Sequence, residues 1–282
     1  MSYHNWKLNC YLGKMKITSY YAFIIVLFAS CKPGHLQVIA DIPDSLKEVS
    51  ALEKLPGSEL YWVIEDSGNE NKVYGINSDG LIMKSIQIQN AKNKDWEDLT
   101  SDNLGNLFIG DFGDNKKERK NYTIYKVSGL DRIENSAVAA LINFELPKKI
   151  KPKDFEAFFI WNGYFYLFSK SDKQTKLFKV PNQSGDHVAE FLSAHDFKGD
   201  NTKITSADIS KDGKIVVLLN HDKLWRLSEF SGDHFFSGKI DSLGFGHNSQ
   251  KEGLFMDDQN NYLISEERTT DFGANIYRLK SD

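Results

Sequence analysis

Cysteine is nearly absent from this chain of 282 residues, and its two copies, Cys10 and Cys31, both stand close to the N-terminus. A disulfide within the rest of the chain is therefore excluded. The roughly 250 residues that follow Cys31 are enough to bury a sizeable core, so we expect packing rather than cross-links to stabilise the domain.

Runs of lysine and arginine are also missing, and the chain carries 35 basic against 39 acidic residues. Nucleic-acid binding needs a basic stripe that neutralises phosphates, so the composition argues against such a partner. Several catalytic signatures are absent too: the Gly-x-Ser-x-Gly elbow, His-Glu-x-x-His and a phosphate-cradling glycine loop with lysine. An acidic surface instead suits small cations or basic ligands.

The uncharged stretch from Tyr20 to Phe28 is too short to cross a membrane, because a spanning helix needs about 20 apolar residues. Lys14 and Lys16 precede it, and two small residues follow it. A basic start, a short apolar segment and a small-residue exit are typical of an export signal. We therefore predict a signal peptide over residues 1–30, a short tether over 31–35 and a single domain over 36–282.

Residues 27–31 resemble the lipobox of bacterial lipoproteins, with Phe28 where that family usually has leucine. The resemblance implies that Cys31 carries lipid and anchors an exported monomer in the cell envelope; a plain secretory signal is the alternative. Residues 32–34 lack the acidic side chains that many surface-exposed lipoproteins have there, which favours the periplasmic side. Three lysines and no acids lie in residues 1–30, so their removal leaves a net charge of −7.

Helical periodicity is missing as well, since no stretch keeps apolar residues at i, i+3, i+4 and i+7 over three turns. What the chain has is a short repeat in which an aromatic residue stands between apolar ones. The aromatic residues follow one another at steps of 51, 53, 47 and 52 residues, a period typical of β-propeller blades. The repeats are residues 73–76, 124–127, 177–180, 224–227 and 276–279.

Each repeat also contains an inner apolar strand, a hairpin turn with Gly or Asn, and a second β-rich run before the aromatic strand. With an outer run after it, each unit supplies four antiparallel strands, which predicts an all-β, five-bladed propeller. The last aromatic strand ends at Leu279, so we expect residues 36–42 to supply the missing outer strand and close the ring. The long interval from Glu97 to Glu156 leaves a six-bladed propeller as the alternative.

Acidic residues recur where the inner strands begin. The equivalent positions are Ser50, Glu97, Glu156, Ala207 and Glu252. In a propeller these positions converge on the central channel, so Glu97, Glu156 and Glu252 are predicted metal ligands. Crowded carboxylates need a cation, and an all-oxygen set favours calcium. The structural alternative is that they bond backbone N–H groups or pair with Lys170, Lys251 or Arg268.

A second set of polar residues is predicted to line the same mouth of the channel and to bind a ligand. Most of them follow the second strand of a repeat, and one, Asp98, follows Glu97. His221 is also a candidate base, although loop histidines are more often only solvated. The predicted ligand-binding residues are Asp66, Asp98, Asp111, Asp114, Asn115, Asn220, His221, Glu266 and Arg268.

Residues 49–52, 60–69, 95–99 and 105–115 resemble the first two blades of exported bacterial propellers of the SdiA-regulated and phytase-like families. This resemblance covers residues 45–127 and implies a propeller that often binds calcium. Glu252 and Gly253 are similar to the channel Glu-Gly of gluconolactonase-type calcium propellers. We expect an anchored propeller that binds a small molecule or protein at its acidic mouth; a calcium-dependent hydrolase of phosphate esters or lactones is the alternative.

Overall fold

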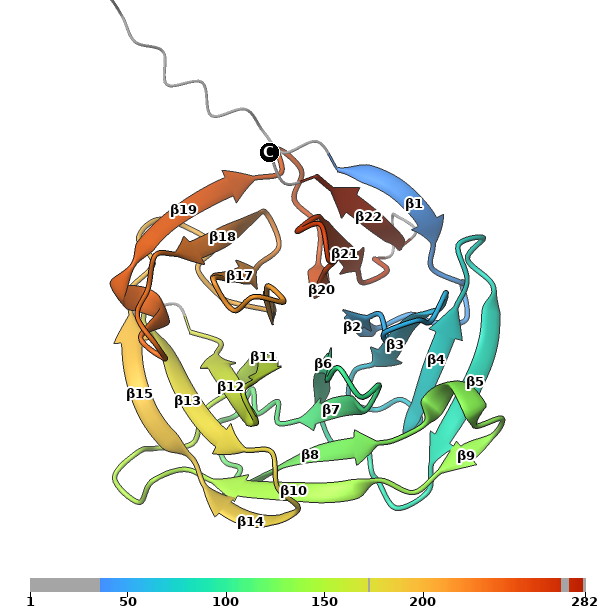
Figure 1. Ribbon diagram of the computed structural model, residues 1–282, viewed down its shortest axis with the longest axis horizontal. Helices are drawn as coiled ribbons and strands as arrows, with labels where there is room; N and C mark the ends of the chain where they lie inside the picture. The colour runs from blue at the N-terminus through green and yellow to red at the C-terminus, as the bar shows by residue number, and fades with distance from the viewer. Residues whose placement is uncertain (1–35, 172, 270–273, 281–282) are drawn as a thin grey trace, which may run out of the picture. The chain divides into compact units, whose positions relative to one another are not determined.

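Five mainly antiparallel sheets stand around a common channel in this computed structural model, which describes residues 36–171, 173–269 and 274–280 (Figure 1). Blade 1 contains β2 (Val49–Glu53), β3 (Tyr61–Glu65), β4 (Lys72–Ile76) and β5 (Ile82–Ile88). Blade 2 contains β6 (Trp96–Ser101), β7 (Leu107–Asp111), β8 (Asn121–Val127) and β10 (Ala140–Glu145). Blade 3 contains β11 (Phe155–Trp161), β12 (Tyr164–Ser169), β13 (Thr175–Pro181) and β15 (Glu190–His195).

The last two blades complete the ring. Blade 4 contains β16 (Ser206–Ile209), β17 (Ile215–Leu219), β18 (Lys223–Ser228) and β19 (Lys239–Gly244). Blade 5 contains β20 (Lys251–Met256), β21 (Tyr262–Glu266), β22 (Asn275–Leu279) and, as its outer strand, β1 (Gln37–Asp41). Each inner strand contacts the inner strands of both neighbouring blades, and β20 contacts β2. The predicted five-bladed propeller is confirmed.

Closure by the N-terminal strand is also as predicted, because β1 pairs antiparallel with β22. The six-bladed alternative is wrong. The long interval after β6 holds a 3-10 turn, η1 (Leu130–Arg132), and β9 (Ser136–Ala137), which joins blade 1 parallel to β5 instead of forming a sheet of its own. Similarly, β14 (Gly185–Val188) joins blade 2 parallel to β10.

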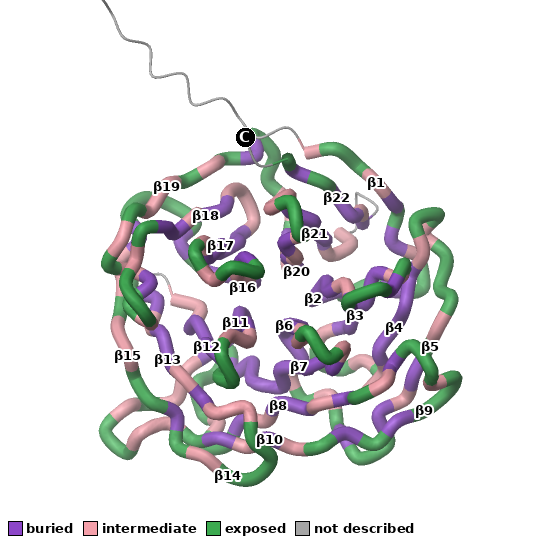
Figure 2. Tube along the Cα trace, viewed as in Figure 1, coloured by how far each residue is buried: buried purple, intermediate pink, exposed green. Residues whose placement is uncertain are grey.

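The repeated aromatic residue packs against the preceding blade. Five hydrophobic clusters fill the five interfaces between neighbouring blades, and each contains one of these aromatics: Tyr74, Tyr125, Phe178, Trp225 and Tyr277. Their spacing in the sequence is therefore the spacing of the blade interfaces. Burial is highest in the inner two strands and falls toward the outer ones (Figure 2).

The predicted signal peptide, Cys31 and the tether lie outside the described residues. Within the part of the chain that is described, no helix is long and apolar enough to cross a membrane. A second 3-10 turn, η2 (Phe235–Ser237), packs beside blades 3 and 4.

Candidate functional site

The strand register shifts by one residue at the start of four inner strands. In each case the extra residue is a position that the repeat had singled out: Ser50, Glu97, Glu156 and Glu252. Such a bulge redirects a side chain and is common beside binding sites. Blade 4 pairs regularly from Ser206, which lies opposite Leu219, so the register places Thr205 at this position and not Ala207 as the sequence comparison assigned. The irregular register therefore accompanies the polar residues that face the channel mouth.

The carboxylates at this mouth belong to blades 1, 2, 3 and 5. Oxygen atoms of Asp66, Asp95 and Glu97 lie within 4.8 Å of one another, and so do those of Glu97, Asp154 and Glu156. Glu252 belongs to neither triad, but its charge contributes to the raised pKa values of Asp66 and Glu156. We call these residues the acidic mouth: Asp66, Asp95, Glu97, Asp154, Glu156 and Glu252.

Asp95 and Asp154 were missed in the sequence, although a repeated pattern contains them. An acid, a large aromatic and a glutamate stand in a row as Asp95-Trp96-Glu97 and again as Asp154-Phe155-Glu156. Both aromatic side chains are fully buried between blades. Their packing fixes the backbone, so the acids on either side are held at the channel.

Gly113 provides the space in which two of these acids approach. A Cβ atom at this position would lie 2.0 Å from Glu97 Oε1 and 2.6 Å from the carboxyl carbon of Asp95. The Gly113 N–H also donates to the Asp95 carbonyl oxygen at 3.2 Å. Any larger residue would separate the two carboxylates from the loop that supports them.

Burial raises the pKa of Glu97 well above its ordinary value, and the charges of Glu156, Asp66 and Asp95 raise it further. Burial likewise raises the pKa of Asp66, to about 6, with Asp95 and Glu252 contributing. Lys170 counters this repulsion by forming a hydrogen-bonded ion pair with Glu156. Although burial lowers the pKa of Lys170, the charges of Glu156, Glu252 and Glu97 raise it above the usual range.

Asp98 lies deeper in the channel and joins three blades. Its Oδ2 accepts a hydrogen bond from the Phe158 backbone N–H at 3.0 Å, and its Oδ1 accepts one from Ser206 Oγ at 3.0 Å. Ser206 Oγ in turn accepts the Leu254 N–H at 3.1 Å. Burial raises the pKa of Asp98, and these donors oppose the rise. Asp98 satisfies backbone groups at the unpaired inner edge of the neighbouring blade.

Asp111 and Glu266 are engaged within their own blades. Asp111 accepts a hydrogen bond from Arg119 Nη1 at 2.9 Å, and Glu266 accepts one from the Tyr277 hydroxyl at 2.6 Å. Burial raises the pKa of Tyr277, and Glu266 raises it further.

Within a blade, a tyrosine at the repeated aromatic position occurs together with an acid at the end of the second strand. Blades whose repeated aromatic is tyrosine have an acid at the end of the second strand: Glu65 with Tyr74, Asp111 with Tyr125, and Glu266 with Tyr277. The equivalent positions in blades 3 and 4 hold Ser169 with Phe178 and Asn220 with Trp225. This correlation is visible in the sequence and indicates an intrablade role for these acids.

Two further predicted residues, Asp114 and Asn115, lie in the loop after β7, and Asp114 organises it. The Asp114 carboxylate accepts the backbone N–H groups of Glu118 at 2.9 Å and Arg119 at 2.8 Å. The Asp114 N–H donates to Asp154 Oδ1 at 2.8 Å, which ties this loop to the acidic mouth. Asn115 is exposed in the same loop.

The remaining predicted residues lie near blades 4 and 5. Asn220 caps a turn, its Oδ1 accepting the Lys223 N–H at 2.9 Å. His221 Nε2 lies 3.1 Å from Glu252 Oε1, beside a cavity of 460 Å³. Arg268 points elsewhere and pairs with Asp44 at 3.0 Å.

Lys251 does not neutralise the acidic mouth either. It is buried, and its Nζ donates to the His221 carbonyl oxygen at 3.1 Å and to Ser249 Oγ at 2.8 Å. Burial lowers the pKa of Lys251 to about 8. Among the three bases considered from the sequence, Lys170 is therefore the one that faces the glutamates.

Fold and site together define a five-bladed β-propeller with an acidic mouth. No family model matches the chain, and no curated protein matches it in sequence. Among solved structures, the PQQ-bound aldose sugar dehydrogenase from Streptomyces coelicolor is similar, with a TM-score of 0.54 and 8% identity over 87% of this chain and 98% of that one. A chain of the nidogen/laminin complex has a TM-score of 0.48 and 10% identity, over 78% of this chain and 72% of that one. At these identities the similarity shows the fold alone.

Proposed function

We propose that the acidic mouth binds calcium and that the propeller uses the ion to hold a ligand or a protein partner. The observation that carries this proposal is the convergence of carboxylates, with Glu97 common to two triads of oxygen atoms within 4.8 Å. The carboxylates of the acidic mouth repel one another when ionised, and a bound cation would relieve this repulsion. The two triads offer oxygen atoms as ligands, which favours a hard ion over zinc or copper.

Asp66, Asp95 and Glu97 fit calcium better than the second triad does. Glu156 of the second triad is already paired with Lys170, whose charge opposes a metal ion there. Three carboxylates supply at most six oxygen atoms, and calcium takes about 6–8, so water or ligand oxygens complete the shell. Those open positions are where a ligand bearing hydroxyl or carboxylate groups would bind.

Chelation tests this proposal. Thermal unfolding of the purified protein is followed with calcium and with a chelator, for the wild type and for Glu97→Gln. We expect the chelator to lower the melting temperature of the wild type and to leave that of the variant unchanged. A wild-type transition that is the same in both buffers would exclude the ion.

The chain's N-terminal features fit an exported, lipid-anchored protein, and we propose Cys31 as the lipidated residue. Its position directly after a short apolar segment supports this. The other cysteine of the chain, Cys10, precedes that segment. Labelling of bacteria that express the protein with a fatty-acid analogue is expected to mark the wild type but not Cys31→Ala. Equal labelling of both would refute lipidation at this residue.

A second candidate is hydrolysis of phosphate esters or lactones. The pairing of His221 with Glu252, beside the cavity of 460 Å³, supports it. A bound calcium ion would supply Lewis acidity. With Nε2–H directed at Glu252, His221 can accept a proton at Nδ1 from a water molecule in the cavity. Calcium-dependent hydrolysis that His221→Asn abolishes would favour this candidate, and inactivity on both substrate classes would leave the binding role.

A further inference from the structure

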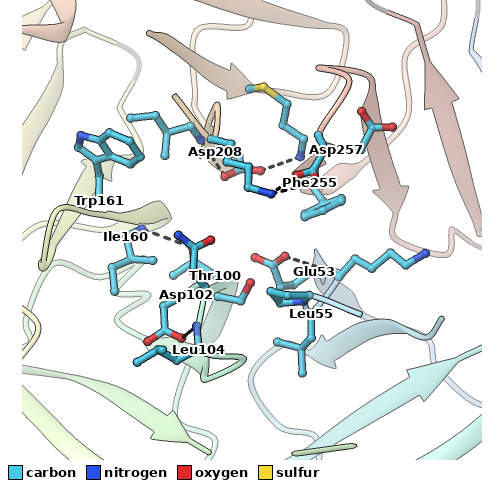
Figure 3. A pocket seen from close by; sticks show the side chains of 18 of the residues that line it. Glu53, Leu55, Thr100, Asp102, Leu104, Ile160, Trp161, Asp208, Phe255 and Asp257 are labelled. Carbon is cyan, nitrogen blue, oxygen red and sulfur yellow. Dashed lines mark hydrogen bonds and ion pairs between the residues drawn. The ribbon is translucent and has the colours of Figure 1, made fainter. Parts of the chain in front are cut away.

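A second cavity, of 1170 Å³, opens at the opposite end of the channel (Figure 3). The C-terminal ends of all five inner strands line it, together with the hairpins that follow them. Because the inner strands run from the acidic mouth toward this cavity, the two sites lie at opposite ends of the same strands. None of the residues of the acidic mouth lines it.

Two carboxylates face this cavity from blades 1 and 4: Glu53, which is buried, and Asp208, which is half-buried (Figure 3). Glu53 is 4% exposed, and its Oε1 accepts the Lys54 N–H at 2.7 Å. Asp208 accepts the backbone N–H groups of Ile209 at 2.7 Å and Met256 at 2.6 Å. These donors are neutral, so neither carboxylate receives a compensating charge from them.

The lysines of the cavity rim pair with other acids. Lys54 Nζ lies 4.0 Å from Glu59, and Lys211 Nζ lies 3.1 Å from Asp258. Within residues 36–171, 173–269 and 274–280, no ion pair reaches Glu53 or Asp208. Burial raises the pKa of Glu53, with Asp208 and Asp98 adding to the rise, and burial raises the pKa of Asp208 to about 7.

The other acids of the cavity have structural roles. Asp102 Oδ1 accepts the backbone N–H groups of Leu104 and Asn106, both at 3.0 Å. Asp257 Oδ1 accepts those of Gln259 and Asn261, both at 2.8 Å. Both acids therefore stabilise hairpin turns. Glu53 and Asp208 differ from these two acids because their charges are near enough to interact and both side chains face the open cavity.

Aromatic and aliphatic side chains form the walls above this pair. Trp161 and Phe255 stand on different sides of the cavity, with Leu55 and Ile160 between the blades (Figure 3). The Trp161 ring is held against the backbone of Gly213, whose φ is +70° and where a Cβ atom would lie 2.1 Å from the indole. The indole is therefore positioned before any ligand arrives.

We propose that this cavity is a binding site for a small organic amine with an apolar body. The ammonium group lies between Glu53 and Asp208, and the body packs against Trp161 and Phe255. An ammonium supplies the charge that the protein does not, and aromatic faces attract cations as well as apolar groups. This site is separate from the acidic mouth and does not depend on calcium.

Titration calorimetry of the purified protein tests the proposal with two probes of similar shape, tryptamine and indole-3-propionate. We expect tryptamine to bind to the wild type and the carboxylate probe not to bind. Glu53→Gln keeps the size of the side chain and removes its charge, so it is expected to weaken tryptamine binding at least tenfold. The matched control is Glu59→Gln, at the exposed rim of the same cavity, with an expected change of less than twofold.

Two further variants separate this site from its alternatives. Trp161→Leu is expected to weaken tryptamine binding, because it removes an aromatic wall of the cavity. If Glu53→Gln does not fold, this variant still tests whether tryptamine binds in the cavity. Glu97→Gln, in the acidic mouth, is expected to leave it unchanged. The proposal is overturned by an absence of tryptamine binding, by equal binding of indole-3-propionate, or by full binding to the Glu53→Gln or Trp161→Leu protein.

Discussion

Lys170→Met removes the lysine that is paired with Glu156 in the acidic mouth. The Glu156 side chain is 4% exposed and that of Lys170 21%, so the pair is largely withdrawn from water. Removing one member of a buried pair costs about 3–5 kcal/mol, because the remaining charge has no partner. For a domain of this size that corresponds to a decrease in melting temperature of about 10 °C in chelator at pH 8.

The same change has two further consequences that follow from its charge. At pH 5 the decrease should be smaller, because Glu156 without its partner binds a proton and becomes neutral. Calcium affinity should rise at least tenfold, because the positive charge of Lys170 opposes the ion, and two unit charges ~4 Å apart in a partly screened site interact by about 4 kcal/mol. Scanning calorimetry at both pH values and a calcium titration measure these effects.

Lys173→Met is the matched control, because it removes the same charge from an exposed position three residues away. It should change the melting temperature by less than about 2 °C and leave calcium affinity unaltered. An equal destabilisation by Lys170→Met at pH 5 and pH 8, with unchanged calcium affinity, would refute the assigned role of Lys170.

Three other outcomes follow from the same contacts. In chelator, melting temperature should fall from pH 5 to pH 8. The pKa of Asp66 is raised to about 6 in the folded state, so this group stabilises the fold at low pH and the contribution is lost as pH rises through 6, by about 1.5 kcal/mol between these two pH values. Calorimetry showing the opposite slope would contradict this. Asp98→Ala should lower the free energy of unfolding by about 3 kcal/mol in urea, because Phe158 and Ser206 lose their acceptor, and a loss below about 1 kcal/mol would contradict its role. Gly113→Ala should weaken calcium binding at least tenfold, because the added methyl group would displace the Glu97 carboxylate. The backbone of Gly113 is not left-handed, so alanine adds no backbone strain there. An unchanged calcium titration would show that the loop moves instead of Glu97.

The number of blades was predictable because each repeated aromatic marks one interface between blades. Tyr74 to Tyr277 recur at nearly constant spacing for that reason, and the missing outer strand after Leu279 predicted the closure by β1. The insertion before β11 was harder to interpret. Its short strand β9 pairs with the edge of blade 1, a long-range choice that local sequence does not encode.

The site was predictable only in outline. Glu97, Glu156 and Glu252 could be selected by equivalence between repeats, but which oxygens approach one another depends on the bulges and on side-chain reach. Asp95 and Asp154 were overlooked although they stand two residues before two of those glutamates.

Acids with structural roles could not be separated from the rest by type alone. Asp98 differs from Glu97 only in its partners across the channel, and those partners lie 60 and 108 residues away in the sequence. Glu53 drew no attention because it ends an ordinary strand. Its position opposite Asp208 exists only once the ring is closed.

Whether the acidic mouth is a calcium site is decided by titrating calcium into chelator-treated protein. We expect the wild type to bind the ion, Glu97→Gln to lose at least tenfold in affinity, and Glu59→Gln to be unchanged. An absence of binding by the wild type, or equal binding by wild type and Glu97→Gln, would contradict this expectation.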